Sequence, residues 1–206
     1  CQGKYKTSIC MIGQATTEQS HNTAKPEVIS ETVQHSMSES HVSLAPGPSP
    51  ILLKTATTTI LHGTNKASLN ILFDEGSQRT FVSEDASKRL NINPAQCPKE
   101  LITLSTFGDS THTAKQFPVT NLEVITRQGS VSLSAIIVPN IAAPIRNFVS
   151  HAQDQHDYLR NLPLATHTAD QDFTIDLLIG ADYFWTIADN QVVRGPGPTA
   201  VASQLG

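Results

Sequence analysis

Charged residues are scarce in this sequence, at 16% of 206 residues, and no basic block stands out. The net charge at pH 7 is -4. A chain that binds nucleic acid needs a basic stripe or patch to neutralise phosphates. We therefore do not expect nucleic acid as a partner of this fragment.

Long apolar runs are also missing. No stretch approaches the roughly 20 apolar residues that a membrane-spanning helix needs, and no charged-then-apolar leader is present. We expect no membrane contact and an intracellular, cytoplasmic location. The chain begins with Cys1 rather than methionine, which favours a piece cut from a longer product.

Cysteine is rare, with only Cys1, Cys10 and Cys97, too few for a disulfide framework. The simpler setting is a reducing one. A catalytic cysteine needs a positioned histidine, and no such histidine is indicated for Cys97, which we expect to be an ordinary loop or core thiol. The eight histidines are scattered without ligand spacing, so we expect no metal and no cofactor.

Composition divides the chain into three zones. Residues 1–10 are small, basic and bounded by cysteines, and residues 11–49 are rich in Ser, Thr, Gln, His and Glu before ending in "APGPSP". The second zone cannot bury enough apolar surface to offset its ordering entropy, so we predict a disordered linker there. Residues 50–206 are predicted to form the folded domain.

Within that domain, β-rich runs alternate with turn signals. His62 to Asn65 and Arg127 to Ser130 each separate two such runs and predict hairpins. "SEDASKRLNI" predicts a short helix with Ser83 as its N-cap. Residues 146–170 are polar and allow either a helix or an excursion loop, and a final strand or two follows "LLIGADYFW". Many short strands and one or two short helices predict a mainly β domain that closes into a barrel.

The stretch "LFDEGSQRTFVS" holds the main candidate site, because an apolar strand breaks there at Asp74, Glu75 and Gly76. An Asp-x-Gly after a strand is either an ordinary turn or the loop that holds a catalytic carboxylate. Two later features favour the second interpretation. A Phe107-Gly108 tip follows about thirty residues on, and an apolar strand that ends at Gly180 comes about seventy residues after that.

The segments "LFDEGSQRTFVS", "LSTFGDS", "LLIGADYFW" and "GPTAVASQLG", in this order, resemble the aspartic peptidase region of BEL/Pao-type LTR retrotransposon polyproteins. The resemblance covers about residues 50–206 and implies a retropepsin-like barrel, which is half of an acid protease. It implies the following site: a catalytic Asp74; an active-site loop of Glu75, Gly76 and Ser77; a flap with Phe107 and Gly108; and a supporting strand of Leu178, Ile179 and Gly180. Asp182 is expected to be structural, bonding either to a nearby arginine or to the start of a helix.

Aspartic proteolysis needs two carboxylates that share one proton, because two like charges about 3 Å apart cannot both ionise. The chain has one Asp-x-Gly loop in the right context, at Asp74. The second carboxylate must then come from another copy, so we expect a two-fold symmetric homodimer. The expected substrate is peptide of the polyprotein itself.

Glu75 departs from the resemblance, since retropepsins usually have Ser or Thr at this position, with a hydroxyl that grips the opposite loop. A further carboxylate near the dyad is costly to desolvate unless it is paired or protonated. Glu75 therefore points outward, to solvent or to a cation such as Arg79, or the site is weakened. Weakening would favour the alternative function of a catalytically inactive dimerisation or spacer module from a decayed or co-opted element.

The stretch "CQGKYKTSIC" is similar to the tail of a zinc knuckle, which in these polyproteins precedes the protease. A knuckle needs four ligands, and here only Cys1 and Cys10 are present, with Tyr5 where the histidine would fall. We expect no stable zinc site. Half a knuckle with a net charge of -4 also disfavours a third function, nucleic-acid binding through residues 1–10.

Overall fold

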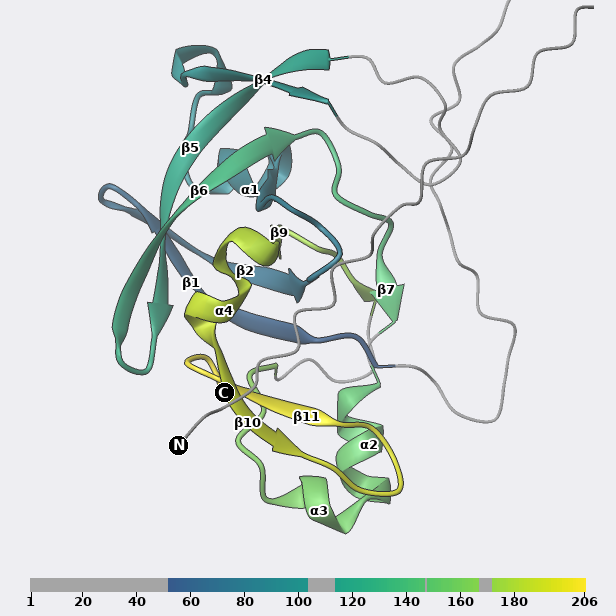
Figure 1. The fold of residues 1–206 in the computed structure, drawn as a ribbon. Helices are drawn as coiled ribbons and strands as arrows, with labels where there is room; N and C mark the ends of the chain where they lie inside the picture. The colour runs from purple at the N-terminus through teal and green to yellow at the C-terminus, as the bar shows by residue number, and fades with distance from the viewer. Residues whose placement is uncertain (1–51, 104–113, 147, 167–171) are drawn as a thin grey trace, which may run out of the picture. The chain divides into compact units, whose positions relative to one another are not determined.

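The computed structural model describes residues 52–103, 114–146, 148–166 and 172–206. Within these ranges the chain is mainly β, as expected, with eleven strands, four short α-helices and one 3₁₀ helix (Figure 1). Helices therefore exceed the expected one or two. The expected knuckle remnant 1–10 and linker 11–49 lie outside the described residues. No helix in the described ranges is long and apolar enough to span a membrane.

The elements follow one another along the chain in this order. The strands are β1 (Thr55–His62), β2 (Asn65–Phe73), β3 (Phe81–Ser83), β4 (Lys99–Thr103), β5 (Ala114–Thr126), β6 (Gly129–Val138), β7 (Ile145–Arg146), β8 (Asp172–Phe173), β9 (Leu177–Ile179), β10 (Ala188–Val193) and β11 (Ala200–Ser203). The helices are α1 (Glu84–Arg89), the 3₁₀ helix η1 (Pro94–Gln96), α2 (Val149–Gln155), α3 (Asp157–Arg160) and α4 (Ala181–Ile187).

Six strands form a closed barrel in the order β1-β2-β9-β3-β6-β5, and β5 pairs back onto β1 through Ile60 and Val124. Closure leaves no free edge among these six strands, which removes the unpaired donors and acceptors of an open sheet. β4 pairs with the outer part of β5 and lies outside the ring. The expected closed barrel is confirmed.

Two hairpins of the barrel match the turn signals of the sequence. β1 and β2 pair from Thr55 with Leu72 to His62 with Asn65, and Gly63 in the turn has a φ of +58°, which glycine adopts at low cost. β5 and β6 meet at Thr126 and Gly129, around the predicted second turn. Both predicted hairpins are confirmed.

The core fills the inside of the barrel with alternate residues of its strands. In β2, Leu69, Ile71 and Phe73 are buried while the residues between them are not. This alternation is the period of two that a strand with one buried face requires. The strands contribute the following core residues: Ala56, Ile60, Leu69, Ile71, Phe73, Val82, Leu122, Val124, Leu133, Ala135, Ile137, Leu177 and Ile179.

The short strand β9 lies between β2 and β3. It runs parallel to β2, with Phe73 opposite Ile179, and antiparallel to β3, with Phe81 opposite Leu178. The chain leaves β2 at residue 74 and enters β3 at residue 81. Residues 74–80 must therefore arch over the end of β9 to reach its other side.

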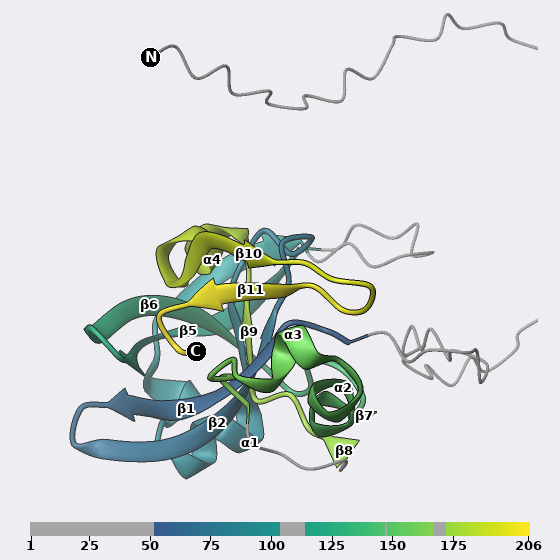
Figure 2. The same ribbon diagram turned by 90° about the horizontal axis from the view of Figure 1, so that it is seen from below.

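Residues 148–166 form two short helices, α2 and α3, beside the C-terminal hairpin of β10 and β11 (Figure 2). The turn of that hairpin packs against α3: the Tyr158 hydroxyl donates to the Pro198 carbonyl, and a Cβ at Gly195 would overlap the Tyr158 ring. The sequence left a helix and a loop open for this polar segment. In the structure this segment forms helices, and α3 contacts the C-terminal hairpin.

The predicted N-cap of α1 is confirmed, and it yields a stability prediction. The Ser83 hydroxyl accepts from the Ala86 amide at 3.1 Å, and Ser83 is 7% exposed. Ser83→Ala removes this acceptor, so the free energy of unfolding should fall by about 1 kcal/mol. Urea denaturation measures the change. Ser132→Ala, on an exposed position of β6, is the control and should change stability by less than about 0.5 kcal/mol.

Candidate active site

Asp74 is the first residue of the arch over β9, and it is half-buried. Its amide donates to the Ile179 carbonyl at 3.0 Å, which extends the parallel pairing of β2 and β9 by one bond. Its carboxylate Oδ1 accepts from the Gly76 amide at 2.9 Å, and the Ser77 amide donates to the Asp74 carbonyl at 3.2 Å. The carboxylate is thus held by its own loop. No other hydrogen-bond partner of this carboxylate is found in the described ranges.

Gly76 and Ser77 follow in the same loop. Gly76 is exposed and does not have a positive φ, so left-handed backbone is not the reason for glycine here. A Cβ on Gly76 would lie 3.1 Å from Asp74 Oδ1, which is a tight contact against the oxygen that the Gly76 amide binds. The Ser77 hydroxyl donates to the Arg79 carbonyl at 2.8 Å. Ser77 therefore uses its hydroxyl within its own loop.

Gly180 lies at the end of β9, directly beneath the arch. The Ala181 amide donates to the Ser77 carbonyl at 2.8 Å, so the loop is bonded to the start of α4. A Cβ on Gly180 would lie 2.8 Å from the Ser77 oxygen and closer still to the Arg79 oxygen. Only glycine lets the two backbones come this close. Leu178 and Ile179 precede it in β9, opposite Leu72 and Phe73.

Thr80 and Asp182 bond the far side of the arch to α4. The buried Thr80 hydroxyl accepts from the Gly180 amide at 3.1 Å and donates to Asp182 Oδ1 at 2.7 Å. The Thr80 amide donates to Asp182 Oδ2 at 3.0 Å. Asp182 is therefore committed mainly to Thr80, and its distance to Arg79 Nε is 3.9 Å. No sequence motif points to Thr80.

Glu75 forms an ion pair with Lys54, at the lead-in to β1. The Lys54 ammonium also lies 4.7 Å from the centroid of the Phe184 ring, a cation–π contact. The sequence left Glu75 pointing outward either to solvent or to a cation, and in the structure the side chain points to a cation. Its partner is Lys54 and not Arg79, because Arg79 is already bonded elsewhere.

Arg79 binds Glu100 of β4 with both ends of its guanidinium: Nη1 donates to Oε1 at 2.6 Å and Nη2 to Oε2 at 2.9 Å. Two parallel bonds of this kind are the strong form of the arginine–carboxylate pair. The hydrogen bond from Arg79 lowers the pKa of the Glu100 carboxyl, and the same bond raises the pKa of Arg79. The pair joins the Asp74 loop to the strand outside the barrel.

The expected flap residues Phe107 and Gly108 lie outside the described residues. β4 ends at Thr103 and β5 begins at Ala114, so these two strands enclose that segment. β4 and β5 pair in register from Lys99 with Pro118 to Thr103 with Ala114. A β-hairpin stem is therefore present on both sides of the expected flap.

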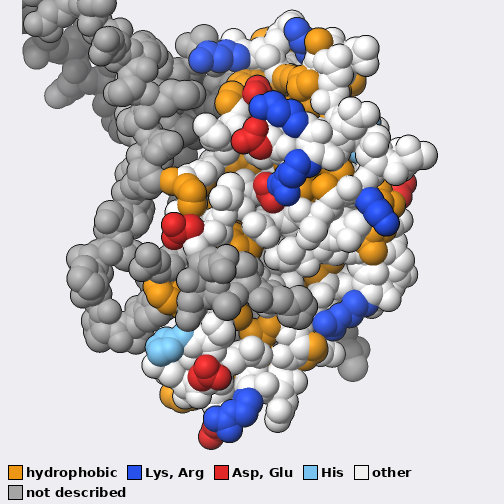
Figure 3. Space-filling view, turned by 180° about the vertical axis from the view of Figure 1, so that it is seen from behind, with side chains coloured by type: hydrophobic (Ala, Val, Ile, Leu, Met, Phe, Trp, Pro, Cys, Tyr) orange, Lys and Arg blue, Asp and Glu red, His pale blue; other side chains and the backbone are white. Residues whose placement is uncertain are grey.

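A groove of about 510 Å³ lies elsewhere, between the lead-in to β1, the helices α2 and α3, and the β10–β11 hairpin. Its lining includes Lys54, Phe73 and Phe184 but no residue of the loop 74–77. The charged side chains on the face opposite to Figure 1 lie mostly as neighbouring acidic and basic groups, not as a patch of one sign (Figure 3). The described side chains on that face form no basic stripe of the kind that tracks a phosphate backbone.

The part of the chain that the structure describes holds no group of three or more His, Cys, Asp and Glu side chains placed to bind a metal. Cys97 is half-buried, and burial raises the pKa of its thiol. A raised pKa disfavours the reactive thiolate.

A scan against models of known protein families finds no match to this chain, and a search of curated proteins finds none either.

The close contact between Gly180 and the arch predicts that a larger residue at position 180 destabilises the fold. Gly180→Ala places a methyl group against the Ser77 and Arg79 carbonyls, and such overpacking should lower the free energy of unfolding by about 1–3 kcal/mol. Urea denaturation measures the loss. Gly63→Asn is the control, because its turn is open and asparagine tolerates the positive φ. Equal stability of Gly180→Ala and the parent chain would contradict the geometry.

The Arg79–Glu100 pair predicts a pH-dependent stability difference. Because the folded pKa of Glu100 lies below its ordinary value of 4.5, the stabilisation is present above pH 4.5 and is lost as the pH falls through the folded pKa. The stability gap between the parent chain and Glu100→Gln should therefore shrink between about pH 6 and about pH 3. Denaturation at both pH values tests this, and the other carboxylates cancel in the difference. A gap that widens in acid would contradict it.

Proposed function

We propose that this chain is the retropepsin-like aspartic endopeptidase of a BEL/Pao-type retrotransposon polyprotein, active as a homodimer that cleaves the polyprotein. The observation that supports it best is the Asp74 loop. Its carboxylate sits at the end of a barrel strand, held by the Gly76 amide, over a glycine that lets β9 pass beneath. The order of motifs along the chain agrees with this arrangement.

The proposed chemistry uses Asp74 of each copy. With the two carboxylates facing across the two-fold axis, one is ionised and the other protonated. The ionised carboxylate takes a proton from water as the water attacks the scissile carbonyl, and the protonated one donates to the developing oxyanion.

A second copy is proposed because two other aspartates at the ends of β9, Asp182 and Asp176, are committed to other bonds. Asp182 accepts from the Thr80 amide and hydroxyl. Asp176 accepts from the Asn70 amide and pairs with Arg89. Asp109, next to the expected flap tip, lies outside the described residues. Asp74 of a partner copy is therefore the proposed second member of the dyad.

The Lys54–Glu75 pair favours a working site over a weakened one. An unpaired carboxylate beside the dyad would raise the cost of ionising Asp74. Here Lys54 neutralises Glu75 and draws it to the lead-in of β1. The hydroxyl grip of Ser or Thr is still missing at position 75. That absence is the observation that favours the alternative, a retropepsin-like dimerisation or spacer module without catalysis.

The proposal predicts that Asp74→Asn abolishes cleavage. Without the carboxylate there is no base for the attacking water, and kcat/KM should fall at least about 100-fold. The assay follows peptide cleavage at mildly acid pH, with a statine peptide as inhibitor. Asp154→Asn on α2, an exposed aspartate, is the matched control and should leave the rate unchanged.

Two outcomes would contradict parts of the proposal. If sedimentation shows a monomer under the assay conditions and this monomer still cleaves peptide, a dyad shared between two copies is ruled out. A folded dimer that cleaves no peptide, with Asp74 intact, would favour the non-catalytic module.

A further inference from the structure

A second cleft, of about 550 Å³, lies between the end of β1, the middle of β5, Ser134 of β6 and the loop that joins α1 to β4. His62, the last residue of β1, lines this cleft at the end of the β1–β2 hairpin that is remote from Asp74. No residue of the arch 74–80 belongs to its lining. The volume is that of a small-molecule site, and the proposed dyad makes no use of it.

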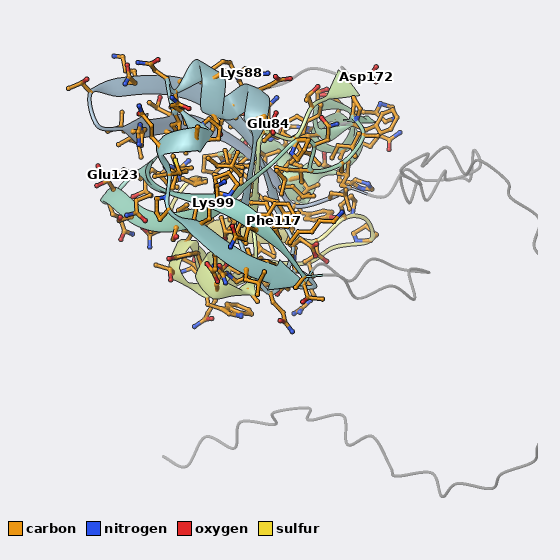
Figure 4. All side chains as sticks on the ribbon, turned by 90° about the horizontal axis from the view of Figure 1, so that it is seen from above. Glu84, Lys88, Lys99, Phe117, Glu123 and Asp172 are labelled. Carbon is orange, nitrogen blue, oxygen red and sulfur yellow. The ribbon has the colours of Figure 1, made fainter. Side chains whose placement is uncertain are left out.

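The most informative residue of this cleft is Thr120 on β5. It lies between Phe117 and Glu123, which Figure 4 labels, and only 6% of its surface is exposed. In the described part of the chain no hydrogen bond of its hydroxyl is found, although every fully buried polar side-chain atom there has a partner. The Thr120 oxygen is therefore still accessible, and the space beside it is the cleft. An unpaired hydroxyl on so buried a residue is rare and calls for a partner that enters the cleft.

Other polar side chains of the lining are also unpaired, and they carry no permanent charge. They are the imidazole of His62, the carboxamides of Gln96 and Asn121 and the hydroxyl of Ser134. None of the four makes a side-chain hydrogen bond within the described ranges. Each carboxamide can donate and accept at the same time. Asp, Glu, Lys and Arg are absent from the described lining.

Apolar side chains complete the cleft, among them Ile92, Pro98 and Val119. Apolar surface with a few polar groups that converge on it is the usual lining of a small-ligand site. Asn91 and Asn93 also line the cleft, but local structure explains both. Asn91 has a φ of +54°, which asparagine tolerates, and the Asn93 side chain caps η1. The argument for a ligand therefore depends on the unpaired groups and not on these two.

We infer that this cleft binds a small, uncharged ring that carries an amide, of the kind found in nicotinamide and in uracil. The amide edge donates and accepts, as the carboxamides of Gln96 and Asn121 do, and it supplies the missing partner of the Thr120 hydroxyl. The faces of the ring contact the apolar part of the lining. An anionic group would lose its hydration without meeting a cation there. This site does not depend on the proposed function.

The first experiment titrates the full ¹⁵N-labelled chain with nicotinamide and, separately, with uracil. The amide resonances of Asn121 and Ser134 should shift with at least one of them, with a Kd of about 10 mM or tighter. The tighter ligand shows whether the amide is a substituent of the ring or part of it. Nicotinate, which has a carboxylate in place of the amide, should bind at least about fivefold more weakly.

The matched variants are Thr120→Val, which replaces the hydroxyl by a methyl group, and Ser132→Ala, at an exposed position of β6 outside the cleft. Thr120→Val should weaken binding at least about fivefold, and Ser132→Ala should leave it unchanged. If neither probe shifts these resonances, the cleft holds water only and the inference is overturned. Equally tight binding of nicotinate, or of the probe to Thr120→Val, also overturns it.

The second experiment measures urea denaturation and needs no ligand. Because the Thr120 hydroxyl has no partner within the fold, Thr120→Val should keep the equilibrium constant for unfolding within about threefold of the parent value, or lower it. Thr80→Val is the comparison, since that buried hydroxyl bonds to Gly180 and Asp182, and its unfolding constant should rise at least about fivefold. An equal rise in Thr120→Val would show that its hydroxyl is bonded within the fold, which contradicts the inference.

Discussion

The parallel pairing of β2 with β9 is the constraint on which the rest of the site depends. Because β3 pairs on the other side of β9, the chain between β2 and β3 has to pass over the end of β9. That passage is the loop that begins at Asp74. The closed barrel holds all three strands in place, so the position of the carboxylate is set by sheet geometry and not by a flexible turn.

Three other carboxylates around the arch each have a partner. Asp182 is satisfied by Thr80, Glu75 by Lys54 and Glu100 by Arg79. The carboxylate of Asp74, in contrast, accepts a bond from the amide of Gly76 in its own loop. This distribution of partners is what the proposed proton-sharing dyad requires.

Much of the local structure could be predicted from sequence, because local chemistry decides it. Gly63 and Gly129 mark the turns, and Ser83 caps α1 with its own hydroxyl. Gly180 was expected to be the last residue of a supporting strand, and it directly follows β9, which ends at Ile179. The sequence did not decide between helix and loop for the residues of α2 and α3, because these residues show no apolar period. They are stabilised by contact with the C-terminal hairpin, which lies about forty residues away.

The sequence by itself indicated the two hairpin turns, the Ser83 cap and the residue at which β2 breaks, since each depends on neighbours within a few positions. For Glu75 it left open solvent, a cation such as Arg79, or a weakened site. Only the tertiary structure decided the partner: Lys54, which lies 21 residues before Glu75, and not Arg79, which lies four residues after it and binds Glu100. An ion pair forms between side chains that are close in space, and folding of the barrel brings Lys54 and Glu75 close together.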